Sequence, residues 1–187
     1  MTDTHVVMLG DSVFDNRSYV AGGPDVLAHM RALAPDGWSV TLRAVDGATT
    51  SGFQRQLDNV PADATCLAIS VGGNDALQTL PLLAMPTSTI GMGLQKLGER
   101  LVAFEKAYRR CVSSALSLGR PVLLLTIYDG DFEPNQRAMT RAGVALFNDV
   151  IIRVARELKV PTVELRHICN EPPCDIPISS IFTGFPR

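Results

Sequence analysis

Residues 5–12 read His-Val-Val-Met-Leu-Gly-Asp-Ser, a short apolar run that ends in a glycine followed by two polar residues. An apolar run of this length, bounded by a turn signal, predicts a fully buried β-strand. Because glycine permits a sharp turn, Asp11 and Ser12 are expected to lie just beyond the carboxyl end of that strand. The stretch therefore predicts a buried strand that presents a serine hydroxyl at its end.

Outward from this stretch, apolar runs alternate with helical patterns along the chain. Further strands are predicted at residues 38–44, 66–71, 121–128 and 160–165, the first of them a half-exposed edge strand. Helices are predicted at residues 24–33, 52–57, 94–118 and 136–158, with a loop and one helical turn at 77–93. Strands alternating with helices are typical of parallel strands joined by right-handed crossovers, with helices on both faces. The pattern thus predicts an α/β fold with a five-stranded parallel sheet.

Size and composition indicate one domain that spans residues 1–187. Hydrophobic residues make up 46% and charged residues 19%, as in globular proteins, and the formal net charge is −2. This balance argues against nucleic acid or an anionic membrane as a partner, because both attract a basic surface. Since the sequence has neither a run long enough to span a bilayer nor a signal-peptide pattern, we expect a cytoplasmic protein.

The segment after the last predicted strand is atypically short, because beyond about residue 168 it is Pro-rich and has no amphipathic closing helix. We expect one face of the sheet to be thinly covered, or to be completed by a second copy in a homo-oligomer. Cys66 and Cys111 lie in apolar or helical stretches and are predicted to be buried thiols. The spacing of Cys169 and Cys174 fits no zinc site, and whether these two cysteines ever pair is left open.

Three loops that follow predicted strands carry glycines and polar residues. They are Gly10-Asp11-Ser12, Asp46-Gly47-Ala48-Thr49 and Gly72-Gly73-Asn74-Asp75. Because the carboxyl ends of parallel strands meet at one edge of the sheet, the loops are expected to converge. A serine there can sit at a helix N-terminus, where the helix dipole favours developing negative charge. The Gly47 N–H and the Asn74 amide can donate to the same oxyanion, which is the stabilisation that acyl transfer needs.

Each motif alone is common turn chemistry, and the informative feature is their occurrence together in this order. With Gly10-Asp11-Ser12, Gly47 and Gly72-Gly73-Asn74-Asp75 as its blocks, the sequence resembles the SGNH, or GDSL, hydrolases. The resemblance implies a flavodoxin-like three-layer α/β/α sandwich of the SGNH-hydrolase type. It also implies esterase- or lipase-like hydrolysis of a small-molecule ester or acyl substrate, without a metal or a cofactor.

The same resemblance implies roles for individual residues. Ser12 is the implied nucleophile, which would attack an ester or thioester and form an acyl-Ser12 intermediate. The N–H of Ser12, the N–H of Gly47 and Nδ2 of Asn74 would form the oxyanion hole. Asp11 and Asp75 would support the loops that carry these groups.

The sequence departs from the family in its last block, an Asp-x-x-His that supplies the general base and its orienting carboxylate. The segment where this block is expected, residues 172–177, holds Asp175 and no histidine. His167 follows the fifth predicted strand and becomes the candidate base, with Glu164 as the carboxylate that would orient it. Because serine without a base is a poor nucleophile, the alternative is a weakened or inactive SGNH-fold binding protein.

Other conspicuous features are interpreted as structural. His5 and His29 are predicted to be structural or solvent-facing. Asp129-Gly130-Asp131-Phe132-Glu133 alternates carboxylates but lacks the glycine and glutamate of a calcium loop, so a solvated acidic turn is predicted. Gly22-Gly23-Pro24 lacks the remaining residues of a nucleotide-binding glycine loop, which also argues against a flavodoxin-like cofactor domain.

Overall fold

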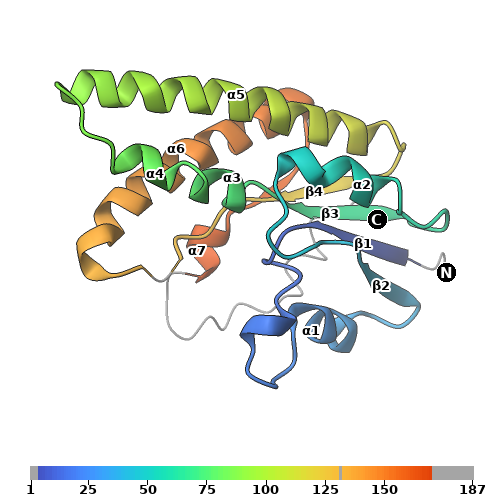
Figure 1. The fold of residues 1–187 in the computed structure, drawn as a ribbon. Helices are drawn as coiled ribbons and strands as arrows, with labels where there is room; N and C mark the ends of the chain where they lie inside the picture. The colour runs from blue at the N-terminus through green and yellow to red at the C-terminus, as the bar shows by residue number, and fades with distance from the viewer. Residues whose placement is uncertain (1–3, 131, 170–187) are drawn as a thin grey trace.

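Five strands form one parallel sheet in the order β2-β1-β3-β4-β5 (Figure 1). The structure, a computed structural model, describes residues 4–130 and 132–169. The strands are β1 (Thr4–Gly10), β2 (Trp38–Leu42), β3 (Cys66–Ser70), β4 (Val122–Leu125) and β5 (Thr162–Val163). The predicted α/β fold with a five-stranded parallel sheet is therefore confirmed.

Helices cover both faces of this sheet, as predicted. In the described part of the chain they are α1 (Val26–Leu33), α2 (Phe53–Leu57), α3 (Gly73–Leu77), α4 (Leu80–Leu83), α5 (Ile90–Leu116), α6 (Pro134–Leu158) and α7 (Leu165–Cys169), with the 3-10 turns η1 (Arg17–Tyr19) and η2 (Thr50–Gly52). Helices α2, α5 and α6 pack on one face, and α1 and α7 lie on the other (Figure 1). None of these described helices combines the length and hydropathy that a membrane span requires.

Strand β1 contributes side chains to both cores. Val7 and Leu9 belong to the core that includes α2, α5 and α6, whereas Val6 and Met8 belong to the core on the α1 side. All four side chains are fully buried. A central parallel strand has no solvent-facing side, which is why this stretch of sequence is a continuous apolar run.

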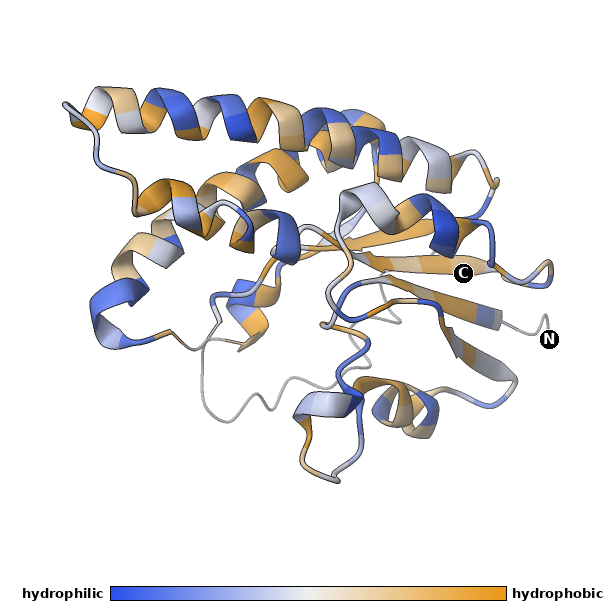
Figure 2. Ribbon diagram, viewed as in Figure 1, coloured by the Kyte–Doolittle hydropathy of each residue, from blue (hydrophilic) through white to orange (hydrophobic). Residues whose placement is uncertain are grey.

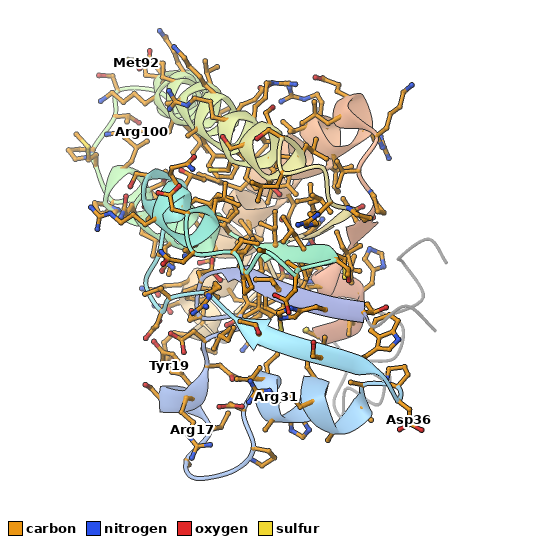
Figure 3. All side chains as sticks on the ribbon, turned by 90° about the vertical axis from the view of Figure 1, so that its right-hand side faces the viewer. Arg17, Tyr19, Arg31, Asp36, Met92 and Arg100 are labelled. Atoms are coloured by element: carbon orange, nitrogen blue, oxygen red, sulfur yellow. The ribbon has the colours of Figure 1, made fainter. Side chains whose placement is uncertain are left out.

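Strand β2 is the half-exposed edge strand that the sequence predicts, since only Val40 among its residues is buried. Arg31 of α1, labelled in Figure 3, donates from Nε and Nη2 to the Val40 carbonyl oxygen, each at 3.2 Å. This contact occupies a backbone acceptor of the edge strand.

Several segments differ in extent from the sequence-based prediction. Strand β4 spans Val122–Leu125 rather than 121–128, β2 ends at Leu42 rather than at residue 44, and the sequence pattern does not predict the short helix α3. Within residues 77–93, α4 is the single helical turn that the sequence predicts. Helix α5, however, begins at Ile90 and not at residue 94, and the Thr89 hydroxyl caps it by accepting from the Met92 N–H at 3.2 Å. Strand β5 spans Thr162–Val163 rather than 160–165, because it pairs with β4 alone and the chain then enters α7. That a partner chain completes one face of the sheet stays a prediction.

Candidate active site

A side-chain amide on helix α2 holds the carboxyl end of β1. Gln56 of α2 accepts from the Gly10 N–H at 2.7 Å through Oε1 and donates to the Gly10 carbonyl at 2.8 Å through Nε2. The Gln56 side chain is buried. Gly10 itself has φ of +129°, and a Cβ at this position would lie 1.7 Å from the Ser70 carbonyl oxygen. The strand end that precedes Ser12 is therefore fixed on two sides and admits only glycine.

Ser12 lies in a single hydrogen-bonded turn and not at the start of a helix. The N–H groups of Phe14 and Asp15 both donate to the Asp11 carbonyl oxygen at 3.1 Å, and the next regular element is the short turn η1. The prediction that a helix dipole acts on Ser12 is therefore wrong, because the chain turns away after one turn. Ser12 is half-exposed and lines a cavity described below.

Asp11 joins this turn to the third loop. Its side chain is 3% exposed, and Val13 N–H donates to its Oδ1 at 3.1 Å. Burial raises the pKa of Asp11 to about 6, and hydrogen bonds from the backbone N–H groups of Val13 and Gly73 oppose that rise. The Asp11 carboxyl thus connects the residue after Ser12 with the first residue of α3.

The second and third loops are connected by Asn74 and Asp75. Asn74 donates one amide hydrogen from Nδ2 to the Ala48 carbonyl at 2.9 Å, which leaves the second hydrogen of that group for another acceptor. The Asp75 carboxylate accepts from the Thr50 N–H at 3.0 Å and from the Thr50 hydroxyl at 2.6 Å. Gly47, next to Ala48, has φ of +75°; it is exposed and does not line the cavity.

The loop that carries Gly47 is also held from the N-terminal side. Asp15 Oδ2 accepts from the Asp46 N–H at 2.9 Å, and the Tyr19 hydroxyl donates to the Asp46 carboxylate at 3.0 and 3.1 Å. Tyr19, labelled in Figure 3, is the last residue of the η1 turn. Sequence reasoning missed Asp15 and Tyr19, because no local pattern signals a contact between residues about thirty positions apart.

A second side-chain amide fixes the chain beyond β4. Asn148 of α6 accepts from the Ile127 N–H and donates to the Ile127 carbonyl, both at 2.8 Å. Asn148 is completely buried. Ile127 and Tyr128 line the cavity, so this contact positions part of its wall. Gln56 and Asn148 thus play the same role at two strand ends.

His167 and Glu164 contact one another at the beginning of α7. His167 Nε2 lies 3.3 Å from Glu164 Oε2, and the His167 side chain is 76% exposed. The Leu165 N–H donates to the Thr126 hydroxyl at 3.0 Å, which attaches α7 to the end of β4 at the edge where α3 also lies (Figure 1). Neither His167 nor Glu164 lines the cavity. Asp175 lies outside the described residues, as does Cys174, the possible partner of Cys169.

The remaining histidines lie away from these loops. His5, near the amino end of β1, contacts the Thr41 hydroxyl through Nε2 at 2.8 Å and the Asp63 carboxylate through Nδ1 at 3.1 Å. His29 is exposed on α1. Both placements agree with a structural or solvent-facing role.

The acidic turn after β4 is less solvated than the sequence suggests. Asp129 has a side chain only 9% exposed, and its Oδ2 pairs with Arg141 Nε at 2.9 Å, because α6 folds back beside the turn. In residues 4–130 and 132–169 no group of three or more His, Cys, Asp or Glu side chains is arranged to hold a metal ion.

Cys66 and Cys111 are buried, as predicted. Burial raises the pKa of the Cys66 thiol to about 11 and that of the Cys111 thiol to about 12, so neither is a ready nucleophile. Cys111 donates from Sγ to the Thr50 carbonyl at 3.3 Å and so packs α5 against the second loop.

A cavity of about 120 Å³ lies beside Ser12 and Asn74. It extends between α3, α4, α5 and α6, and α4 is strongly hydrophobic along its length (Figure 2). Its apolar walls include Leu77, Leu80, Leu83, Leu97, Val144 and Phe147. A hydroxyl and a side-chain amide donor thus share a concave, largely apolar site, which is the usual form of a small-molecule site.

Comparison with known proteins agrees with the fold described above. The sequence profile of the GDSL-like Lipase/Acylhydrolase family matches residues 8–177. A search of curated proteins finds no match to the chain.

Several solved structures with a similar fold are esterases or lipases of low sequence identity. A catalytic mutant of an acetylxylan esterase from Geobacillus stearothermophilus is 18% identical, with a TM-score of 0.67 over 96% of this chain and 84% of that one. Phospholipase A1 from Streptomyces albidoflavus NA297 is 16% identical, with a TM-score of 0.65 over 90% and 82%. An extracellular lipase from Streptomyces rimosus is 17% identical, with a TM-score of 0.64 over 88% and 81%. At these identities the likeness shows the fold.

Proposed function

This chain belongs to the GDSL-like lipase/acylhydrolase family, and on that basis we propose that it is a serine hydrolase that cleaves carboxylic esters or thioesters through an acyl-Ser12 intermediate. The observation that carries the proposal is that Ser12 is half-exposed and lines, together with Asn74, a largely apolar cavity. A hydroxyl nucleophile, an amide donor and room for an acyl group are then present in one place.

In the proposed reaction, Ser12 Oγ attacks the carbonyl carbon of the substrate and its proton passes to a general base. The carbonyl oxygen becomes an oxyanion, which the N–H of Ser12, the N–H of Gly47 and Asn74 Nδ2 stabilise. Collapse of this intermediate expels the alcohol or thiol, which takes the proton from the base. Water then hydrolyses acyl-Ser12, releases the carboxylic acid and restores the hydroxyl. The hydrogen bond from Asn74 Nδ2 to the Ala48 carbonyl supports the role of Asn74 in the oxyanion hole, because this bond holds the amide in place and uses only one of its two hydrogens.

His167 is the proposed base, and Glu164 the carboxylate that orients its imidazole. Their contact at 3.3 Å supports this pairing. Catalytic mutants of the acetylxylan esterase replace a serine, an aspartate and a histidine, which supports a search for a carboxylate and a histidine as well as a serine. Because His167 does not line the cavity, its action on Ser12 requires the imidazole to move toward the substrate.

The second candidate function is that of a catalytically weakened or inactive binding protein. It is favoured by one observation: among the described residues, no histidine lines the cavity beside Ser12. Such a protein would keep the fold and the cavity and would bind an ester or acid without turning it over.

Labelling with a fluorophosphonate, combined with hydrolysis of a p-nitrophenyl ester, tests these proposals. We expect the wild-type protein to be labelled and Ser12→Ala to lose all labelling; labelling that survives this change rejects Ser12 as the nucleophile. His167→Ala is expected to lower kcat by about 10³-fold or more, whereas the matched control His29→Ala keeps its activity. A wild-type protein that is neither labelled nor active, but is stabilised by an ester analogue, favours the binding protein.

A further inference from the structure

We propose that the cavity beside Ser12 is an acyl-chain site for unbranched chains of about four to eight carbons, and that it disfavours both acetyl groups and long-chain lipids. This inference rests on the proposed function, because it takes Ser12 as the residue that carries the acyl group. It names the substrate class that the family alone leaves open.

The chemistry of the walls favours a hydrocarbon chain over a sugar. The walls away from Ser12 and Asn74 are formed largely by leucine, valine and phenylalanine side chains. Three threonines also line the cavity, but their hydroxyls already contact the backbone. Thr79 donates to the Asp75 carbonyl at 3.2 Å, Thr140 donates to the Gln136 carbonyl at 3.0 Å, and Thr126 accepts from the Leu165 N–H at 3.0 Å. A buried sugar hydroxyl would lose its hydrogen bonds to water here, whereas a methylene chain loses none.

The size of the cavity sets the length of the chain. Its volume is about 120 Å³. An apolar protein cavity of about 150 Å³ holds benzene, with its six carbons, so this one accommodates a chain of similar size. An acetyl group leaves most of the apolar wall uncovered. A chain of palmitoyl length exceeds this volume, and its outer part would remain in water.

A substitution at Gly143 of α6 can fill part of this cavity. It lines the cavity, and a Cβ at this position would meet no atom within 4 Å. A larger side chain here therefore extends into space that an acyl chain would occupy. Gly98 of α5 offers a matched control, since a Cβ there also meets no atom within 4 Å but Gly98 does not line the cavity. Both are helix-interior glycines, so backbone effects of substitution are comparable.

The experiment measures kcat/KM on p-nitrophenyl esters from acetate to palmitate for wild type, Gly143→Leu and Gly98→Leu. For wild type we expect a rise of about fourfold for each added methylene up to hexanoate or octanoate, followed by a plateau or a fall. Gly143→Leu should lower the ratio of octanoate to acetate activity by about tenfold or more, and Gly98→Leu should leave that ratio unchanged. Gly143→Ala, which fills less space and favours the helix, should give a smaller shift in the same direction. A wild-type optimum at acetate, or equal ratios in the two leucine variants, overturns the inference.

A binding measurement separates this inference from the proposed catalysis. Octanoate should stabilise the Ser12→Ala protein against heat, and should stabilise the Ser12→Ala/Gly143→Leu protein much less. If no ester is hydrolysed but this difference is found, the cavity binds acyl chains and only the proposed catalysis fails. If esters are hydrolysed with no dependence on chain length, and octanoate stabilises the proteins with and without Gly143→Leu equally, the acyl-chain site is rejected while the proposed hydrolase activity is kept.

Discussion

Replacing Gln56 by methionine should destabilise the strand end that carries Ser12. Methionine keeps the length and the apolar contacts of the side chain but removes both hydrogen bonds to Gly10. The Gly10 N–H then loses its acceptor in a buried position, which costs about 1–3 kcal/mol. The Gly10 carbonyl keeps one partner, because it also accepts from the Val45 N–H at 3.0 Å. Losing its hydrogen bond from Gln56 therefore costs only about 0.5–1.5 kcal/mol of stability.

The expected loss in the free energy of unfolding is therefore about 1.5–4.5 kcal/mol, a large part of the roughly 5–15 kcal/mol that a domain typically has. Urea unfolding followed by far-UV circular dichroism measures it, and the midpoint should fall by roughly 1–2 M. Gln54→Met is the matched control on the same helix. Gln54 is exposed and donates from Nε2 to the Asp58 carboxylate at 2.9 Å, so the loss of this surface contact should hardly change the midpoint. Equal midpoints for the two variants would refute the reasoning, because Gly10 would then have found other partners.

Three further changes test the same framework. Gly10→Ala places a Cβ 1.7 Å from the Ser70 carbonyl oxygen and should cost more than about 4 kcal/mol, seen as loss of soluble protein or a much lower Tm. Asn148→Leu removes both hydrogen bonds to Ile127 and should cost about 2–4 kcal/mol in urea unfolding. Burial raises the pKa of Asp11 from 3.8 to about 6, so the folded protein holds this proton more tightly than the unfolded chain. As pH rises from 4 to 6, the carboxyl should therefore lower the free energy of unfolding by up to about 3 kcal/mol, with no further change at higher pH. Urea unfolding of wild type and Asp11→Asn across this pH range checks the prediction, because the variant should lack this pH dependence.

The sequence was sufficient to predict the strands and their parallel arrangement. Val6 to Leu9 form a continuous apolar run because a central parallel strand is buried on both faces, and β3 and β4 follow the same rule. The position of the three loops at strand ends then follows from topology, because parallel strands bring their carboxyl ends to one edge. Ser12 and Asn74 were found in this way, and the structure places both beside one cavity.

Other features could not be read from any local pattern. Gln56 and Asn148 are ordinary polar residues on helices, and their roles appear only when they meet backbone groups 46 and 21 positions away. The turn after Ser12 contains two local hydrogen bonds to the Asp11 carbonyl, and the early start of α5 has a cap at Thr89; hydrophobic periodicity registers neither. The shape and volume of the cavity depend on how α4, α5 and α6 pack together.

The amino-acid sequence by itself determined which segments are buried strands and which residues stand at their ends, because burial imposes a periodicity that the chain carries locally. Only the tertiary structure decided which side chains hold those ends and how much apolar space lies beside the serine. Such contacts join residues far apart in sequence, and their geometry depends on the packing of whole elements.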